Sequence, residues 1–267
     1  MKLKLFILLL CCFYKISAQE KLKGKFDYKV TYKLDFKLDS TSTEKRSEFM
    51  ILYLGDEISQ FSSRAYVLEN PLVINGNNGS TSRLAVTKFF IKTIKDREAS
   101  KMYNSVFVPM TDFFYVQDLS LFDWEIYPET KMIKDYKVQK ATTSFAGRDY
   151  VAWFTTEVPV SDGPYKFNGL PGLILEIADT GNDYVFSFIG LEKLAPALTY
   201  KMNFNQYVQS TQEDIAERLH EYCRDPMTHM RAQGHNTNNK LDPEWHKKMV
   251  AAFTEMLEKE NNPLELE

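Results

Sequence analysis

The chain is poor in the residues that form disulfides, hold metals or act as catalytic bases. Its 267 residues include three cysteines and four histidines, and Cys11 and Cys12 lie in an N-terminal segment that we expect to be removed. Cys223 then remains alone, which excludes an intramolecular disulfide. The sequence also lacks the H-E-x-x-H, G-x-S-x-G and phosphate-loop motifs. These absences argue against the zinc-protease, α/β-hydrolase and P-loop enzyme classes.

Basic blocks and long hydrophobic runs are also missing. The formal net charge is −3, and the sequence contains no cluster of basic residues. Nucleic acid and anionic lipid are therefore poor partners. The apolar run over residues 5–14 is shorter than the roughly 20 residues that a transmembrane helix needs. We therefore predict no nucleic-acid partner and no transmembrane segment after residue 18.

The first 18 residues have the composition of a secretory signal peptide. Two lysines precede the apolar run, and Ser17 and Ala18 form a small-residue cleavage site before Gln19. We expect export, with the mature chain in the periplasm, associated with the outer membrane, or secreted. Lipid attachment at Cys11 or Cys12 is an alternative, although neither follows the small residue that lipoprotein processing usually requires.

Most of the mature chain has the pattern of β-strands. Over residues 24–38, aromatic and aliphatic residues alternate with lysine, aspartate and threonine, which predicts one long strand with a buried and a solvated face. A stretch of Gly, Asn and Ser at residues 75–82 predicts a surface loop. Shorter apolar segments predict strands over residues 49–54, 58–61, 84–94, 113–117, 136–138, 150–154, 173–177 and 184–190, and a hairpin over 124–133.

After Ala195-Pro196 the pattern changes to helical. Ser210 and Glu213 have the spacing of a capping box, and Asp242 followed by Pro243 is a typical helix start. The expected fold is α+β and mostly β, a curved antiparallel sheet with two C-terminal helices, one of them against the concave face. The domains are a signal peptide (1–18), a β-rich domain (19–205) and a helical segment packed on the sheet (206–267). This element order resembles outer-membrane lipoprotein carriers, by analogy alone.

The most constrained backbone lies at residues 163–176, G-P-Y-K-F-N-G-L-P-G-L-I-L-E. Pro171 and Gly172 occupy the two central positions of an expected type II turn, in which Gly172 takes a positive φ. Gly169 allows the chain to enter this turn in close packing. We assign Gly169, Pro171 and Gly172 a structural role.

The hexapeptide G-L-P-G-L-I at residues 169–174 resembles the signature of the GLPGLI family, secreted proteins of Gram-negative bacteria without an established activity. The resemblance covers residues 119–191 closely. It rests on further matched words upstream, among them W-E-I at 124–126, Q-K-A at 139–141, F-A-G-R-D-Y at 145–150 and A-W-F at 152–154. It implies export and carries no catalytic residue with it.

Five residues of this region are candidates for ligand binding: Arg148, Tyr150, Trp153, Asn168 and Glu176. Arg148 follows a turn glycine, and its guanidinium could clamp a carboxylate or phosphate. Glu176 lies within an apolar strand and needs a partner there. We expect an Arg148–Glu176 ion pair that, with Asn168, fixes the turn. The alternative leaves Arg148 facing a ligand.

The C-terminal part offers a metal alternative. Thiol, thioether and imidazole groups gather there, and these ligands suit Cu(I) or Zn(II). The spacing matches no closed metal-site template, and Cys223 is equally explained as a buried apolar thiol. The candidate ligands are Cys223, Met227, His229, Met230 and His235.

Three functional readings follow. The first is an exported β-rich binding protein that holds an apolar or peptide-like ligand, or a cell-envelope partner, beside aromatic residues of the signature region. The second is a protein that binds copper or zinc through the C-terminal part. The third is an enzyme using Asp162 or Glu176 for acid–base chemistry. We rank the third last because no nucleophile or base constellation accompanies these carboxylates.

Overall fold

The computed structural model describes residues 21–65, 87–108, 111–232 and 242–266. The expected signal peptide, the loop at 75–82 and His235 lie outside these residues. The fold is α+β and mostly β, as predicted: one open sheet of 12 strands with three helices near the C-terminus. The strand order is β12-β6-β5-β4-β3-β2-β1-β11-β10-β9-β8-β7, antiparallel throughout apart from the β12–β6 pair.

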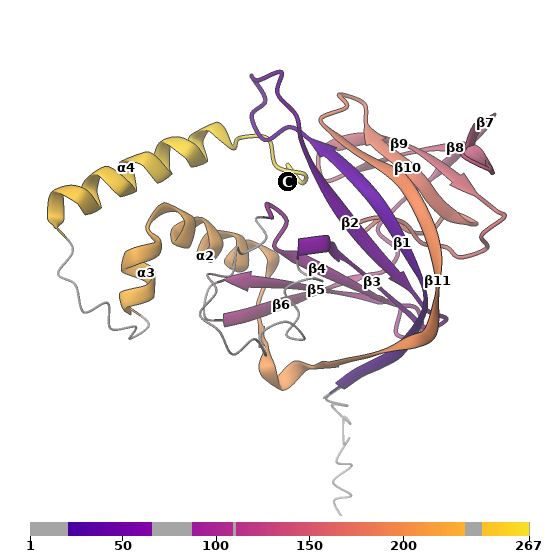
Figure 1. Cartoon of the computed structure of the whole chain (residues 1–267), viewed down its shortest axis with the longest axis horizontal. Coiled ribbons are helices and arrows are strands. Elements are labelled where there is room, and N and C mark those ends of the chain that lie inside the picture. Colours follow the sequence, from indigo (N-terminus) through magenta and orange to yellow (C-terminus); the bar gives the residue numbers. More distant parts are fainter. Residues whose placement is uncertain (1–20, 66–86, 109–110, 233–241, 267) are drawn as a thin grey trace, which may run out of the picture.

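The strands have the following bounds: β1 Lys21–Phe36, β2 Arg46–Leu54, β3 Ile58–Ser63, β4 Ile91–Asp96, β5 Lys101–Val108, β6 Thr111–Asp118, β7 Glu125–Ile133, β8 Tyr136–Phe145, β9 Arg148–Thr155, β10 Leu173–Asp179, β11 Tyr184–Asn203 and β12 Val208–Gln209. The sheet is strongly curved, with β1, β2 and β11 running steeply while β3 to β6 spread beneath the helices (Figure 1). Register shifts between β1 and β11 mark bulges, which bend strands.

β1 lies at the centre of the sheet and is paired on both sides, to β11 and to β2. The predicted alternation is confirmed except at Tyr28, which is 39% exposed; Phe26, Val30, Tyr32 and Leu34 are all fully buried. Val30, Tyr32 and Leu34 join side chains of β8 to β11 in the main hydrophobic core, whereas Phe26 belongs to a second cluster with Ile58 and Ile94. The face that β1 presents inward therefore organises the core around it.

The observed strands differ from the predicted ones in four places. β5 was missed because most of its residues are buried on both faces, so no alternation shows. The expected hairpin over 124–133 is a single edge strand, β7, with a register shift between Ile126 and Thr130 that accommodates Pro128. Of the predicted strand over 84–94, only residues 87–94 are described, and among these the strand starts at Ile91. β11 also continues well past Ala195-Pro196, because its far half pairs with the start of β1.

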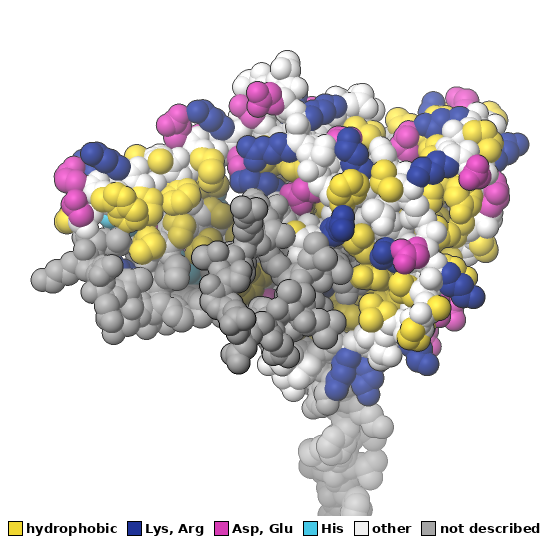
Figure 2. All heavy atoms as spheres, viewed as in Figure 1, with side chains coloured by type: hydrophobic (Ala, Val, Ile, Leu, Met, Phe, Trp, Pro, Cys, Tyr) yellow, Lys and Arg dark blue, Asp and Glu magenta, His cyan; other side chains and the backbone are white. Residues whose placement is uncertain are grey.

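In the described C-terminal part of the chain the helices are α2 (Gln212–Arg224), α3 (Pro226–Ala232) and α4 (Pro243–Lys259), one more than expected there. Thr211, not Ser210, caps α2, since its side chain accepts from the Asp214 backbone N–H; Asp242 caps α4 as predicted. Ile215 of α2 is buried against β5 and β6. α4 contributes no buried residue and extends away from the sheet (Figure 1). Hydrophobic side chains gather over this end of the molecule (Figure 2).

Candidate functional site

Residues 163–176, here called the signature stretch, contain a turn that differs from the expected one. Gly169, not Gly172, has a positive φ, at 98°. The Gly172 N–H donates to the Leu170 carbonyl at 2.8 Å, which closes a turn one residue shorter than predicted. Gly172 is nevertheless required, because a Cβ there would lie 2.0 Å from the Thr155 carbonyl oxygen. Gly172 therefore allows two backbone segments to approach closely, and it does not adopt a left-handed conformation.

A buried charge cluster ties this stretch to β4. The Asp162 carboxylate is fully buried and lies 2.7 Å from both Lys95 Nζ and Arg97 Nη2. Lys95 also donates to the carbonyls of Gly163 and Phe167, at 2.9 and 2.8 Å. Burial lowers the pKa of Lys95, and the charge of Asp162 opposes that shift. The charged groups of this cluster pair with one another and with backbone carbonyls, and so they hold the signature stretch against β4.

Arg148 does not pair with Glu176, so that prediction was wrong. Arg148 Nη1 lies 3.1 Å from Asp179 Oδ2, and both side chains are almost fully buried. Glu176 instead binds Lys131 Nζ at 2.6 Å, with both side chains about one third exposed. The reason is strand geometry: Glu176 is the cross-strand partner of Trp153, on the partly exposed face of the sheet.

The five proposed ligand residues are therefore divided among three places. Arg148 and Tyr150 point into the protein, toward the C-terminus. Trp153 and Glu176 lie together on the outer face, where Lys131 Nζ sits 4.2 Å from the Trp153 ring centre. Asn168 donates to the carbonyls of Leu119 and Lys166 and so supports the turn. These residues do not line a common cleft.

Sequence reasoning also missed the C-terminal segment, residues 260–266. After α4 it returns toward the sheet (Figure 1), where it is hydrogen-bonded to Arg148 and Tyr150 of β9 and to Tyr184 of β11. Asn262 and Leu264 are buried, while Asn261, Pro263 and Leu266 are exposed. This alternation is that of an extended chain lying in a surface groove. A segment this short carries too little pattern to be recognised in the sequence.

Main-chain groups of the C-terminal segment make five hydrogen bonds to the sheet and its loops. Side chains of the sheet donate three of these, all to carbonyl oxygens of the segment. Carbonyls in two loops, one after β1 and one between β8 and β9, accept the other two from backbone N–H groups of the segment. The bonds are Arg148 Nη2 to Pro263 O (2.6 Å), Tyr150 Oη to Leu264 O (3.3 Å), Tyr184 Oη to Asn262 O (2.5 Å), Asn262 N to Leu38 O (2.9 Å) and Leu266 N to Ala146 O (2.9 Å).

Glu265 provides the charged contact of the segment. Its carboxylate lies 2.5 Å from Lys166 Nζ and accepts hydrogen bonds from Tyr165 and Gln212 at 2.7 and 2.6 Å. Lys166 is fully buried, and its ammonium lies 5.4 to 5.8 Å from the ring centres of three aromatic side chains. Burial lowers the pKa of Lys166, and the negative charge of Glu265 raises it in part.

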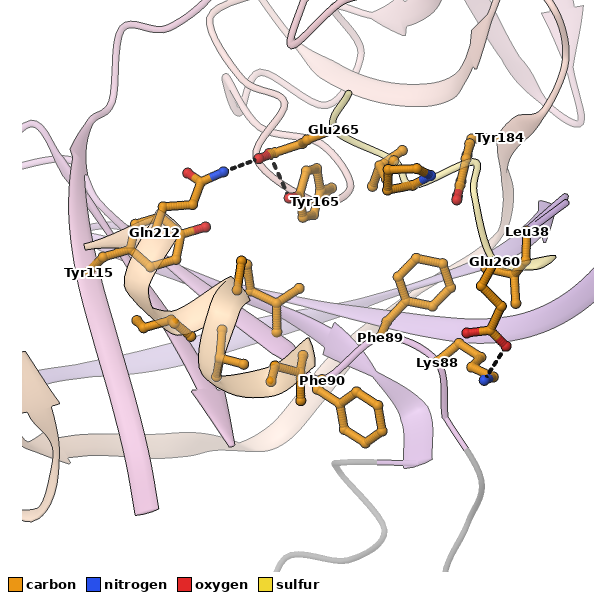
Figure 3. A pocket seen from close by; sticks show the side chains of 17 residues that line it. Leu38, Lys88, Phe89, Phe90, Tyr115, Tyr165, Tyr184, Gln212, Glu260 and Glu265 are labelled. Atoms are coloured by element: carbon orange, nitrogen blue, oxygen red, sulfur yellow. Dashed lines mark hydrogen bonds and ion pairs between the residues drawn. The ribbon is translucent and has the colours of Figure 1, made fainter. Parts of the chain in front are cut away.

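A cavity of about 370 Å³ lies between α2, the strands β4 to β6 and the C-terminal segment (Figure 3). Its polar groups gather at two ends, a Lys88–Glu260 ion pair of 2.5 Å and the Tyr165–Glu265–Gln212 cluster. Burial raises the pKa of Tyr165 far above 10, so its hydroxyl stays a donor. The other lining residues are Leu38, Phe89, Phe90, Ile91, Val106, Tyr115, Tyr184, Ile215, Ala216, Leu219, Pro263 and Leu264.

Two of the proposed metal ligands, Cys223 and His229, have defined surroundings. Cys223 is free and half-buried, and burial raises the pKa of its thiol. The His229 ring packs edge-on against Tyr222, with centres 5.5 Å apart. Within the residues described, no three His, Cys, Asp or Glu side chains are placed to share a metal ion. Because His235 lies outside them, binding of copper or zinc stays a prediction.

Comparison with known proteins gives a short family match and a fold likeness. A family model described as a protein of unknown function (Porph_ging) matches residues 146–176, which contain the G-L-P-G-L-I hexapeptide. Two structures of PNGF-II, in space groups C2 and P21, are similar at 15% identity, with TM-scores of 0.54 and 0.53. The match covers 73% of this chain and 33% of that chain, so this chain spans about a third of PNGF-II. At this identity the likeness shows the fold alone.

Curated proteins gave no match. None of the described helices combines the length and apolar character needed to cross a membrane.

Proposed function

We propose that this chain is an exported β-rich binding protein that holds an apolar ligand in the cavity between α2, β4 to β6 and the C-terminal segment. The cavity itself carries this proposal. Its volume of about 370 Å³ falls in the range of small-molecule sites, which are mostly apolar with a few fixed polar groups. Here aliphatic and aromatic side chains form the middle, and the polar groups stand at the ends (Figure 3).

The ligand contacts in this proposal differ from those expected from the sequence. Arg148 and Tyr150 hold the C-terminal segment, which forms one wall, and do not face the cavity. Phe89, Val106 and Leu219 line it directly. An apolar molecule placed among them removes hydrophobic surface from water, at roughly 25 cal/mol for each Å² buried.

The ion pairs of the candidate carboxylates favour ligand binding over acid–base chemistry. Asp162 and Glu176, the two candidates for such chemistry, are each paired with lysine. Glu260 and Glu265 at the ends of the cavity are also paired with lysine. A carboxylate held in an ion pair with lysine is a weak general base, so these four side chains are better suited to fixing the shape of the protein around a ligand.

A hydrophobic fluorescent probe tests the proposal. N-phenyl-1-naphthylamine should bind the wild-type chain at a stoichiometry near one, and Leu219→Trp, which fills the cavity, should weaken binding at least tenfold. Leu257→Trp on α4 is the matched control, because Leu257 does not line the cavity. Equal binding by both variants would place the probe elsewhere and sink the proposal. Native mass spectrometry of protein purified from its own cell envelope should show a bound apolar molecule.

A further inference from the structure

The C-terminal segment occupies a groove with the features of a peptide-binding site. We define this groove by Arg148, Tyr150, Tyr165, Lys166 and Tyr184. Arg148 and the tyrosines at 150 and 184 donate to successive carbonyl oxygens of the segment. Contacts to main-chain groups recognise any extended peptide, while pockets for alternate side chains select its sequence.

The side-chain pockets of the groove define the peptide that it selects. Asn262 accepts from Arg148 at 2.6 Å and donates to the Lys37 carbonyl at 2.8 Å. Leu264 is buried within the main core. Glu265 neutralises Lys166. The selected pattern is therefore Asn, any residue, Leu and an acidic residue.

The helix that carries the segment does little to hold it in the groove. α4 has no buried residue, and Trp245 and Met256 on it are 50% and 39% exposed. If the segment leaves the groove, the contacts that are broken are therefore chiefly those made by residues 260–266. Because Pro263 and Leu266 are exposed, the groove opens directly to solvent once the segment leaves.

We propose that this groove binds an extended peptide of the pattern Asn-x-Leu-acid from a partner protein, and that the chain's own C-terminal segment occupies it in the absence of that partner. The inference does not rest on the apolar-ligand function. A tethered segment has an effective concentration in the millimolar range, so a partner peptide competes only at comparable levels or when the segment is weakened.

The test uses the full chain and a labelled peptide with the sequence of residues 260–266, E-N-N-P-L-E-L. Leu264→Asp weakens the tethered segment and leaves the groove residues unchanged. This variant should bind the peptide at least tenfold more tightly than the wild-type chain does. The matched control is the same peptide with Asp in place of the leucine that corresponds to Leu264, and it should bind neither protein. A folded Leu264→Asp chain that does not distinguish the two peptides overturns the proposal.

A second measurement needs no variant of the protein. In the wild-type chain, the N–H groups of Asn262 and Leu266 are hydrogen-bonded to carbonyls outside the segment. Millimolar E-N-N-P-L-E-L should accelerate hydrogen exchange in residues 260–266 severalfold, with no change in β1, and the leucine-to-aspartate peptide should not. Unchanged exchange in the segment at 10 mM peptide, roughly the upper end of the effective concentration expected for a tether, also overturns the proposal.

Discussion

At Gly172 two backbone segments approach so closely that no side chain fits between them. A Cβ would lie 2.0 Å from the Thr155 carbonyl oxygen and 2.7 Å from its carbon, and neither group can rotate away. Gly169, three residues earlier, has the left-handed conformation instead. The two glycines of the hexapeptide therefore serve different purposes, one steric and one conformational.

Gly172→Ala should lower the free energy of unfolding by about 1–3 kcal/mol, the usual cost of forcing atoms into a packed interior. Gly190→Ala is the matched control, because a Cβ there meets nothing within 4 Å. Its effect should stay below about 0.5 kcal/mol. Urea unfolding followed by far-UV circular dichroism measures both. Equal midpoints for the two variants would contradict the close approach.

Arg148→Ala should destabilise the chain by about 3–5 kcal/mol, because it leaves the buried Asp179 carboxylate without its cation. Glu176→Ala should cost no more than about 1 kcal/mol, since its pair with Lys131 is partly exposed. Double-mutant cycles by denaturant unfolding should give strong coupling between Arg148 and Asp179 and coupling below about 0.5 kcal/mol between Arg148 and Glu176. Strong Arg148–Glu176 coupling would refute this assignment.

Among the elements, the helices differ in how they are attached. α2 buries Ile215 against side chains of β5 and β6 and adds partly buried Leu219 and Tyr222. α4 lies against α2 and buries none of its own residues. α2 therefore forms a wall of the cavity, whereas α4 positions the C-terminal segment.

Ile215→Ala should lower the free energy of unfolding by about 2–5 kcal/mol, because it leaves a void under α2. Met256→Ala on α4, where the side chain is 39% exposed, should change it by less than about 0.5 kcal/mol. Thermal unfolding monitored by near-UV circular dichroism compares the two. A larger effect at Met256 would mean that α4, and not α2, is the helix docked on the sheet.

At the scale of the whole molecule, the C-terminal segment joins parts of the chain that are remote in sequence. Asn262 contacts the chain after β1, the turn before β11 and the start of β9. The Asp183 carboxylate takes part in this junction through Lys37 and Asn262. Burial acts to raise the pKa of Asp183, but these hydrogen bonds, with the charges of Lys37 and Arg148, lower it overall.

Asp183 should therefore make stability depend on acid pH. A carboxyl whose folded-state pKa lies below its unfolded value stabilises the fold above the unfolded pKa, about 4, and loses this contribution as the pH falls through the folded-state pKa. Between pH 6 and pH 2.5, the free energy of unfolding of Asp183→Asn should fall less than that of the wild type. Identical pH profiles from urea unfolding would contradict this linkage.

Export is the other prediction that concerns the whole molecule. The basic start, short apolar run and Ser17-Ala18 site predict cleavage before Gln19. N-terminal sequencing of protein from the cell envelope or the medium should begin at Gln19. Retention of residues 1–18, or a lipid on Cys11 or Cys12, would contradict it.

The sequence by itself determined the strand-rich class, the central strand β1 and the start of α4. Period-two alternation from Phe26 to Phe36 depends only on which residues prefer water, and this preference is local. The cap at Asp242 is local as well, because a side chain and a backbone group two residues away suffice to make it. β5 shows the limit: a strand buried on both faces has no alternation to read.

Only the tertiary structure decided the partners of the buried charges and the course of the C-terminal segment. Arg148 is 114 residues away in sequence from Asn262, and Lys95 is 67 residues away from Asp162. Several carboxylates compete for each cation, and the sequence does not rank them. The choice follows from which face of a strand each side chain occupies and which strands become neighbours, and both are consequences of packing the whole sheet around one core.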